Sequence, residues 1–397
     1  MIDQIRSSIL KSVPTKEIET FLSEKKHLFL KNFQGSSALF ALSEIKSKTG
    51  TILYITKDFE RSAAVAADLE QISDSRVYLF PPTRKKPYDT GKVVDMSVLV
   101  QRSEVLEKIS SGADGIIVAS IDAIVEKLVP ADVFHKSSIK LEKGAEIRPE
   151  DLSERLTDQG YSATRFVDEP GEFAVRGGIF DVYPFSGEYP VRLEFFGDEI
   201  ESIREFDPNS QRSISFLNET RLVPNSGGDQ SQSMESLLSY LSEDSPIIAE
   251  DIDVLTAEIS EYFEKAEKSY SEINENEFSA PEQNYVSTEE WKRDIGKRSL
   301  ILLGSFNKSI QFDKTIELNS SPHPSFHGNF KLLREFITDH TKKGYQTYIL
   351  ADHENQKERF EELLGEPGDE FMYRVSTQTI HEGFVLNAEK KAILTDH

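Results

Sequence analysis

Short, mostly apolar segments alternate with amphipathic ones along the first 125 residues, and this alternation is the strongest constraint on the fold. The apolar segments include TILYIT (51–56) and GIIVAS (115–120), and amphipathic segments such as DFERSAAVAADLEQI (58–72) lie between them. Strands that are apolar on both faces are typical of parallel sheets covered by helices on both sides. Residues 1–125 are therefore predicted to form an α/β domain around a parallel sheet.

After this first domain the periodicity changes. An amphipathic helix is expected over 151–162, followed by strands in which apolar and charged residues alternate, as in VRLEFF (191–196). The GDE sequence at 197–199 is typical of a hairpin turn between two such strands. Residues 126–209 are therefore predicted to form a small inserted α+β domain.

The rest of the chain is predicted to complete the first domain and then to form another one. Residues 210–318 return to the first domain and contain the buried strand SLILLGS (299–305). Residues 319–330 are rich in Ser, Asn, Pro and Gly, which indicates a linker. A separate small α/β domain is expected over 331–397, and its end directly after a strand favours a piece of a longer protein.

Composition limits the class of function. There is no Cys among the 397 residues, so neither a disulfide framework nor a thiolate metal site is possible. The eight His are scattered, and we expect no metal site. The charged N-terminus is no secretory signal and no apolar run is long enough to span a membrane, so a cytoplasmic location is expected. The net charge of −23 argues against a nucleic-acid-gripping role, although PTRKKPYD (82–89) is locally basic.

The stretch LFLKNFQGSSALFALSEI (28–45) has the strand, Gly/Ser turn and helix of a phosphate-binding P-loop. A working loop places a Lys on the phosphates and a Ser or Thr on magnesium. Here the turn holds Gly35 and Ser36, and the positions after it hold Ser37, Ala38 and Leu39. From these residues alone, the stretch is either an ordinary strand-turn-helix or a degenerate nucleotide loop, and no catalytic residue is identified.

The stretch GEFAVRGGIFDVYPF (171–185) contains the best candidates for a binding surface. In a regular strand Arg176 and Phe180 share one face. That face would offer a partner a guanidinium group, which can donate two parallel hydrogen bonds, and a flat apolar ring. Alternatively, Phe180 belongs to the core and Arg176 pairs with a local carboxylate such as Glu194. A bulge at Gly177-Gly178 would swap the faces of the two residues.

RFVDEPGEFAVRGGIFDVYPF followed by VRLEFFGDEIESIREFDPNSQRS closely resembles the N-terminal region of bacterial transcription-repair coupling factors, and more distantly the repair protein UvrB. The resemblance implies that 1–125 and 210–318 form one P-loop-like α/β domain, split by the insert at 126–209. It also implies that Ala38 and Leu39 stand where a working loop has Lys and Thr, so that nucleotide binding is lost.

The resemblance further implies that the inserted domain binds UvrA, the damage-scanning ATPase. The family's contact residues map onto Arg176 and Phe180. A basic contact of many relatives is not matched at Ser162-Ala163, where Arg165 lies close by as a substitute, and Arg192 is a further candidate.

The implied function is a non-catalytic N-terminal fragment that recruits UvrA to stalled RNA polymerase. The parent would be an ATP-dependent DNA translocase whose motor domains use ATP and magnesium, and this fragment would need no cofactor. RNA polymerase and DNA would bind beyond residue 397, and the rest of the parent chain would mask the UvrA surface. The alternatives are an NTP-binding protein and a UvrB-like binder of damaged DNA.

Overall fold

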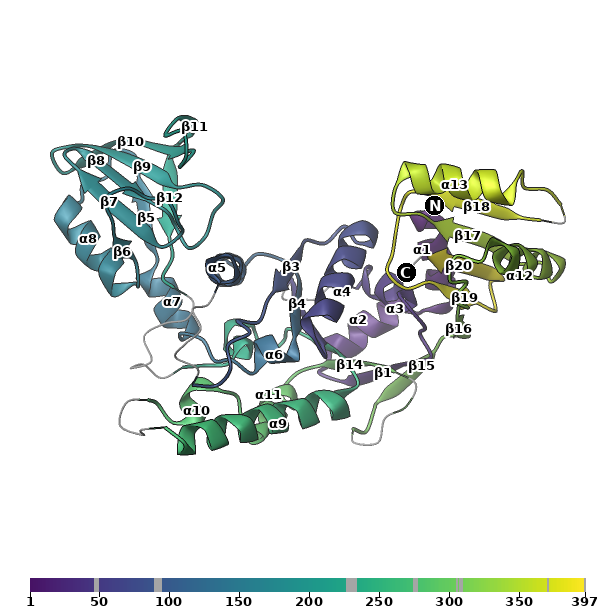
Figure 1. The fold of residues 1–397 in the computed structure, drawn as a ribbon. Coiled ribbons are helices and arrows are strands. Elements are labelled where there is room, and N and C mark those ends of the chain that lie inside the picture. Colours follow the sequence, from purple (N-terminus) through teal and green to yellow (C-terminus); the bar gives the residue numbers. More distant parts are fainter. Residues whose placement is uncertain are drawn as a thin grey trace.

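The structure is a computed structural model that describes residues 1–45, 50–88, 95–225, 234–273, 278–304, 306, 310–369 and 371–395. Every site residue named above lies within these ranges, whereas Asp89 of the basic stretch lies outside them. Three units are arranged side by side (Figure 1). We call them the central unit, built on a seven-stranded sheet, the inserted unit (139–222) and the C-terminal unit (320–395).

Every strand pairing in the sheet of the central unit is parallel, which confirms the predicted fold class. In spatial order its strands are β15 (Lys314–Glu317), β1 (His27–Lys31), β14 (Leu300–Gly304), β13 (Ile247–Glu250), β2 (Thr51–Thr56), β4 (Gly115–Ser120) and β3 (Val77–Phe80). Strands from before and after the inserted unit therefore join in one sheet, and the inserted unit leaves and re-enters without interrupting it.

Helices cover both faces of this sheet, as the apolar character of its strands requires. One face carries α1 (Ile2–Ser12), α2 (Thr15–Ser23), α3 (Ser37–Leu42) and α4 (Phe59–Ile72). The other face carries α5 (Met96–Ser110), α6 (Ile121–Ile124), α9 (Ile252–Ser271) and α11 (Thr288–Ile295), with α7 (Ala131–Ser137), α10 (Pro281–Asn284) and the 3-10 turn η1 (Leu237–Tyr240) nearby. The helices α4, α5 and α9 begin where an Asp side chain (Asp58, Asp95 or Asp251) accepts a backbone N–H of the first turn.

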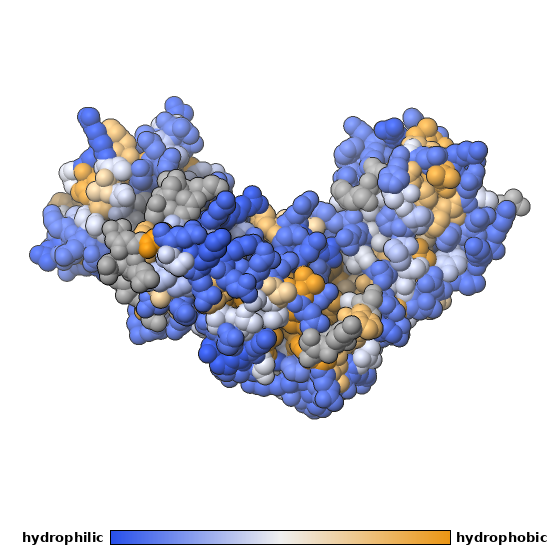
Figure 2. All heavy atoms as spheres, turned by 60° about the horizontal axis from the view of Figure 1, so that its bottom comes forward, coloured by the Kyte–Doolittle hydropathy of each residue, from blue (hydrophilic) through white to orange (hydrophobic). Residues whose placement is uncertain are grey.

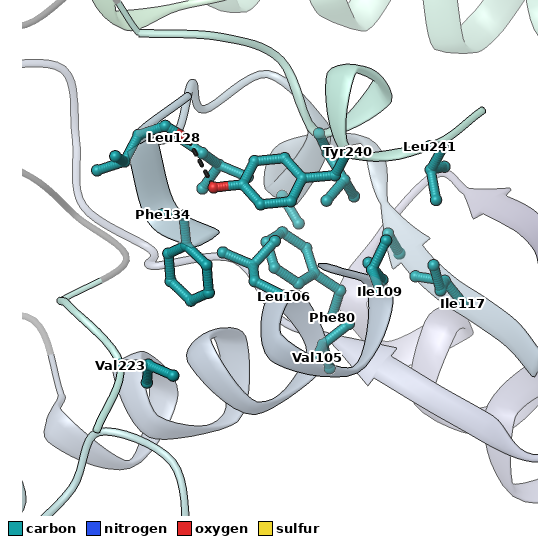
Figure 3. Close-up of a cluster of buried hydrophobic side chains, with 14 of the residues drawn as sticks. Phe80, Val105, Leu106, Ile109, Ile117, Leu128, Phe134, Val223, Tyr240 and Leu241 are labelled. Carbon is teal, nitrogen blue, oxygen red and sulfur yellow. Dashed lines mark hydrogen bonds between the residues drawn. The ribbon is translucent and has the colours of Figure 1, made fainter. Parts of the chain in front are cut away.

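The side chains of each strand alternate between two hydrophobic clusters. Leu53 and Ile117 belong to the cluster that continues into the inserted unit, whereas Ile52 and Ile116 belong to the cluster that continues into the C-terminal unit. Figure 3 shows part of the first cluster, where the Tyr240 hydroxyl donates a hydrogen bond of 2.6 Å to a backbone carbonyl oxygen. Each face of the sheet therefore shares its core with one neighbouring unit.

The inserted unit contains a six-stranded sheet and a two-stranded one. The larger sheet has the order β11 (Ser213–Leu217), β10 (Glu199–Phe206), β9 (Val191–Phe196), β8 (Ile179–Val182), β7 (Glu172–Arg176) and β6 (Ser162–Ala163). The smaller sheet pairs β12 (Glu219–Leu222) with β5 (Ile139–Glu142), and α8 (Pro149–Asp158) packs nearby. Because β11 and β12 pair with strands of this unit, it extends beyond its predicted end at residue 209.

The C-terminal unit has a five-stranded sheet with the order β16 (Ser320–Pro322), β19 (Phe384–Leu386), β20 (Lys391–Thr395), β17 (Gln346–Leu350) and β18 (Tyr373–Ser376). Its helices are α12 (Phe330–Lys342) and α13 (Glu354–Leu364). The stretch predicted to be a linker, 319–330, therefore contains an edge strand, because β16 pairs antiparallel with β19.

Figure 2 shows that the inserted and C-terminal units form two lobes on either side of the central one. Hydrophilic side chains cover most of this face, and apolar ones gather in smaller areas. In the described part of the chain, no helix combines the length and apolar character needed to cross a membrane.

Candidate partner-binding surface

Strands β7 and β8 form a hairpin whose two-residue turn is Gly177-Gly178. Gly177 has a φ angle of 60°, a left-handed conformation that glycine adopts without a steric penalty. Because the chain reverses here, Val175 and Phe180 lie opposite each other and share a face. The expectation that Arg176 and Phe180 share a face, which assumed an uninterrupted strand, is therefore wrong.

Phe180 lies in the core of the inserted unit, with 0% of its surface exposed. Its ring stacks on that of Phe173 with centroids 5.7 Å apart, and the ring of Phe195 lies 6.4 Å away. A side chain in this position supports the hairpin from beneath and is closed to direct contact with a partner. The burial of Phe180 therefore supports the alternative that it is a core residue.

Arg176 and Arg192 share one buried carboxylate, that of Asp181. Arg192 donates from Nε at 2.6 Å and from Nη2 at 2.8 Å to the two carboxylate oxygens, a bidentate pair. Arg176 forms an ion pair with Asp181, which is the local carboxylate that the second alternative called for, although Glu194 was the example given. Hydrogen bonding to Asp181 raises the pKa of the Arg192 guanidinium, so this side chain stays charged at every physiological pH. Two guanidinium groups around one carboxylate leave the cluster with a positive charge.

Phe166 lies exposed beside this cluster. Its side chain is on the loop between β6 and β7, and 49% of its surface is open to solvent. The Arg176 guanidinium lies 4.6 Å from the centre of the Phe166 ring, and that of Arg165 lies 5.7 Å from it. Arg–aromatic contacts of this kind hold both partners in place. The structure therefore brings two of the predicted residues, Arg165 and Arg176, together around an aromatic ring that the sequence analysis missed.

Arg165 is exposed and has no ion-pair partner among the described residues, so its guanidinium is open to a carboxylate of another molecule. Arg192 is different, because only 11% of its side chain is exposed and its guanidinium group is already paired with Asp181. Of the four predicted partner-binding residues, Arg165 and Arg176 lie at the surface, while Arg192 and Phe180 support them from below. We call Arg165, Phe166 and Arg176 the arginine–phenylalanine patch.

The rest of this sheet face is crossed by further polar pairs. Glu194 accepts a hydrogen bond of 2.6 Å from the Ser202 hydroxyl and forms an ion pair with Arg204. Two other aromatic side chains are strongly exposed, Phe196 by 79% and Phe216 by 73%. They lie at the end of strand β9 and on the edge strand β11, and among the described residues no guanidinium group stacks on either ring.

The predicted degenerate loop connects β1 and α3. Gly35 has a φ angle of 52°, and Ser36 and Ser37 are buried. Ala38 and Leu39 are 4% and 2% exposed and pack into the cluster shared with the C-terminal unit. Side chains at these two positions point into a closed core, where a phosphate-binding cation or a magnesium ligand would have no access to a nucleotide.

No group of three or more His, Cys, Asp or Glu side chains in the described ranges is arranged to bind a metal ion. The charged groups of the arginine–phenylalanine patch are the guanidinium groups of Arg165 and Arg176, and the buried carboxylate of Asp181 is held between Arg176 and Arg192. The patch is suited to recognition through stacking and charge.

The chain is similar to known proteins at two levels, through a family model that matches its inserted unit and through individual relatives that align with longer parts of it. Residues 139–227 match the family model of the UvrB interaction domain, a range that includes all strands of the inserted unit. The transcription-repair-coupling factor of Bacillus subtilis is 33% identical over 225 residues, which are 56% of this chain and 19% of that protein. The corresponding factor of Borreliella burgdorferi is 26% identical over an alignment that covers 100% of this chain and 38% of the relative.

A third relative, from Staphylococcus epidermidis, is 21% identical over 83% of this chain and 33% of its own length. The chain thus spans well under half the length of these relatives. Its fold, its matched residues and these relatives agree with the motifs of the sequence: the chain is similar to the N-terminal region of transcription-repair-coupling factors, and its residues 139–227 match the UvrB interaction domain.

Proposed function

We propose that this chain is the non-catalytic recruiting part of a transcription-repair coupling factor, and that its inserted unit binds UvrA. The observation that carries the proposal is the arginine–phenylalanine patch on the surface of the matched UvrB interaction domain. An exposed aromatic ring held by two guanidinium groups has the composition of an interface hot spot, which is rich in aromatic residues and Arg. The partner face that fits it is a shallow apolar pocket with carboxylates at its rim.

In the proposed organisation, one α/β domain is split around the inserted unit and a small α/β domain follows. The parent protein would be an ATP-dependent translocase whose motor domains use ATP and magnesium, and this chain would require no cofactor. RNA polymerase and DNA would bind regions beyond residue 397, and the rest of the parent would mask the UvrA surface. A cytoplasmic location belongs to the same proposal.

Binding of the chain to purified UvrA by titration calorimetry tests the proposal. We expect Phe166→Ala and Arg176→Ala each to raise the Kd at least about tenfold, as loss of a hot spot does. Phe216→Ala is the matched control, because Phe216 is another exposed Phe on the same sheet. Arg155→Ala on α8 controls for the loss of an exposed positive charge. If all four folded variants bound UvrA with the wild-type Kd, the patch would not be part of the interface.

The proposed absence of nucleotide chemistry needs a separate test. Titration of the chain with ATP and magnesium should give no binding at micromolar concentrations, because the buried Ala38 and Leu39 stand where a working loop has Lys and Thr. Binding in that range would favour the alternative of an NTP-binding protein.

A further inference from the structure

A segment of the C-terminal unit lies directly on the loop between β1 and α3. The backbone N–H of Ser36 donates a hydrogen bond of 3.0 Å to the carbonyl oxygen of Glu382. The N–H of Glu382 donates in return to the Ser36 hydroxyl at 3.2 Å, across 346 residues of sequence. The N–H of Gln34 donates at 3.0 Å to the hydroxyl of Ser320, which begins β16. Backbone donors of the loop therefore bind groups of the C-terminal unit.

The glycine of this loop allows the close approach. Gly35 has a φ angle of 52°, and a Cβ atom there would lie 2.8 Å from the carbonyl oxygen of Glu382 and still closer to that of Gly383. Both obstacles are backbone atoms, which cannot turn aside as a flexible side chain can. Any residue other than glycine at position 35 would thus push the 382–383 backbone away.

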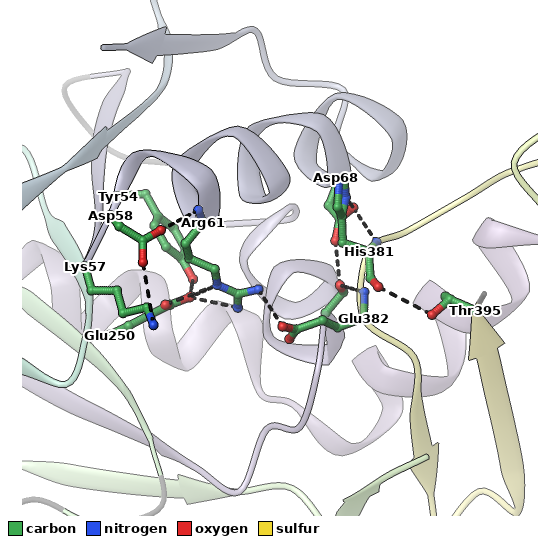
Figure 4. A network of polar contacts seen from close by, with 10 residues as sticks. Tyr54, Lys57, Asp58, Arg61, Asp68, Glu250, His381, Glu382 and Thr395 are labelled. Carbon is green, nitrogen blue, oxygen red and sulfur yellow. Dashed lines mark hydrogen bonds and ion pairs between the residues drawn. The ribbon is translucent and has the colours of Figure 1, made fainter. Parts of the chain in front are cut away.

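Asp68 of helix α4 fixes the same contact from the side (Figure 4). Its side chain is 3% exposed and accepts hydrogen bonds of 2.8 Å from both the backbone N–H and the Nδ1 of His381. The Ser36 hydroxyl donates to its other oxygen. One buried carboxylate therefore ties the loop, the helix and the C-terminal segment together.

A second charged group completes the contact. Arg61, in the first turn of α4, donates to both carboxylate oxygens of Glu250 at 3.1 and 3.2 Å and forms an ion pair of 3.1 Å with Glu382 (Figure 4). Beneath these polar groups, the rings of Phe40 and Phe384 meet edge to face with centroids 5.9 Å apart. The contact thus combines packed aromatic rings with hydrogen bonds and ion pairs around them.

We propose that residues 32–37 form a docking socket whose ligand is the segment 380–383 of the same chain. The socket, and not the connecting segment after residue 318, determines where the C-terminal unit sits. It uses backbone donors of a P-loop-like turn to hold backbone carbonyl groups, and the seated segment closes the turn to other ligands. The socket lies outside the UvrB interaction domain at 139–227, so this proposal does not depend on UvrA binding.

Hydrogen–deuterium exchange of the full chain, read on peptides that cover 36–42 and 380–386, tests the proposal. We expect Gly35→Ala to speed exchange of both peptides at least about tenfold, because the added Cβ separates them. Gly112→Ala is the matched control: Gly112 also has a positive φ, of 75°, but a Cβ there would meet nothing within 4 Å. Its exchange at both peptides should stay at the wild-type rate.

A second variant, His381→Ala, removes one bond to Asp68 without altering the central unit, and it decides the question if Gly35→Ala does not fold. It should speed exchange of both peptides, while UvrA affinity stays at the wild-type value. Faster exchange of 380–386 alone, or rates equal to those of Gly112→Ala, would overturn the socket. Loss of UvrA binding in a folded His381→Ala protein would equally contradict the independence of the two sites.

Discussion

Arg192 holds Asp181 through both carboxylate oxygens, at 2.6 Å from Nε and 2.8 Å from Nη2. The acceptor is 1% exposed, and Arg176 contacts the same carboxylate nearer the surface. Asp181 is therefore the buried counter-charge that positions the partly exposed guanidinium group of Arg176 in the arginine–phenylalanine patch. Removing it would leave two Arg side chains beside each other without an anion.

Asp181→Ala is expected to destabilise the inserted unit by about 3–5 kcal/mol, the usual effect of breaking a buried charge pair. Urea denaturation measures this change. Asp198→Ala is the control, since Asp198 lies exposed in the β9–β10 turn. A loss of less than about 1 kcal/mol for Asp181→Ala would mean that solvent replaces the carboxylate and that the pair is not a structural element.

Phe180→Ala and Phe166→Ala should separate folding from recognition. Truncating the buried Phe180 opens a cavity, which costs about 3–5 kcal/mol of unfolding free energy. Truncating the half-exposed Phe166 should change stability by less than about 0.5 kcal/mol. Thermal denaturation run beside the UvrA titration checks both values. A stable Phe180→Ala protein with weakened binding would contradict the supporting role given to Phe180.

The ion pair of Arg102 and Glu126 is expected to matter more than the exposed pair of Lys136 and Asp132. Arg102 and Glu126 are 2.9 Å apart with 3% and 11% of their side chains exposed, whereas Lys136 and Asp132 are 76% and 65% exposed. Arg102→Ala leaves Glu126 buried without a cation and should cost about 3–5 kcal/mol. Lys136→Ala should cost less than about 1 kcal/mol in the same urea experiment. Equal losses would mean that burial does not determine the strength of these pairs.

The C-terminal unit should lose stability in mild acid. Burial of the His340 ring, which stacks on Phe336 with centroids 3.7 Å apart, lowers the pKa of this His below its ordinary value of 6.5. The folded state thus favours the neutral ring, and the stability that it contributes above pH 6.5 is lost as the pH falls through the lowered pKa. Denaturation between pH 7.5 and 5 should show a shallower loss for His340→Gln than for the wild type. Identical slopes would exclude His340 as the group that titrates.

Local sequence pattern predicted most of the elements. GIIVAS became β4 and VRLEFF became β9, because runs of apolar residues and strict alternation report directly on burial. The hairpin turn at Gly197-Asp198 also followed from its sequence, since a glycine in a left-handed conformation is what such a turn needs.

Non-local pairing was not predictable in the same way. Ser320–Pro322 has the composition of a linker and becomes a strand only because β19 presents an edge to it. The shared face expected for Arg176 and Phe180 failed because Gly177-Gly178 reverses the chain. Phe166 gave no signal of its own, since its significance depends on a guanidinium group that the hairpin brings to it.

The central sheet also acts as a partition. In β14, Ile301 packs with the cluster that reaches the C-terminal unit, and its neighbour Leu302 packs with the cluster that reaches the inserted unit. Consecutive residues of one strand therefore serve different lobes of the molecule. The inserted and C-terminal units each share a core with only one face of the central sheet. One unit can therefore change its contacts or its sequence while the packing of the other is preserved.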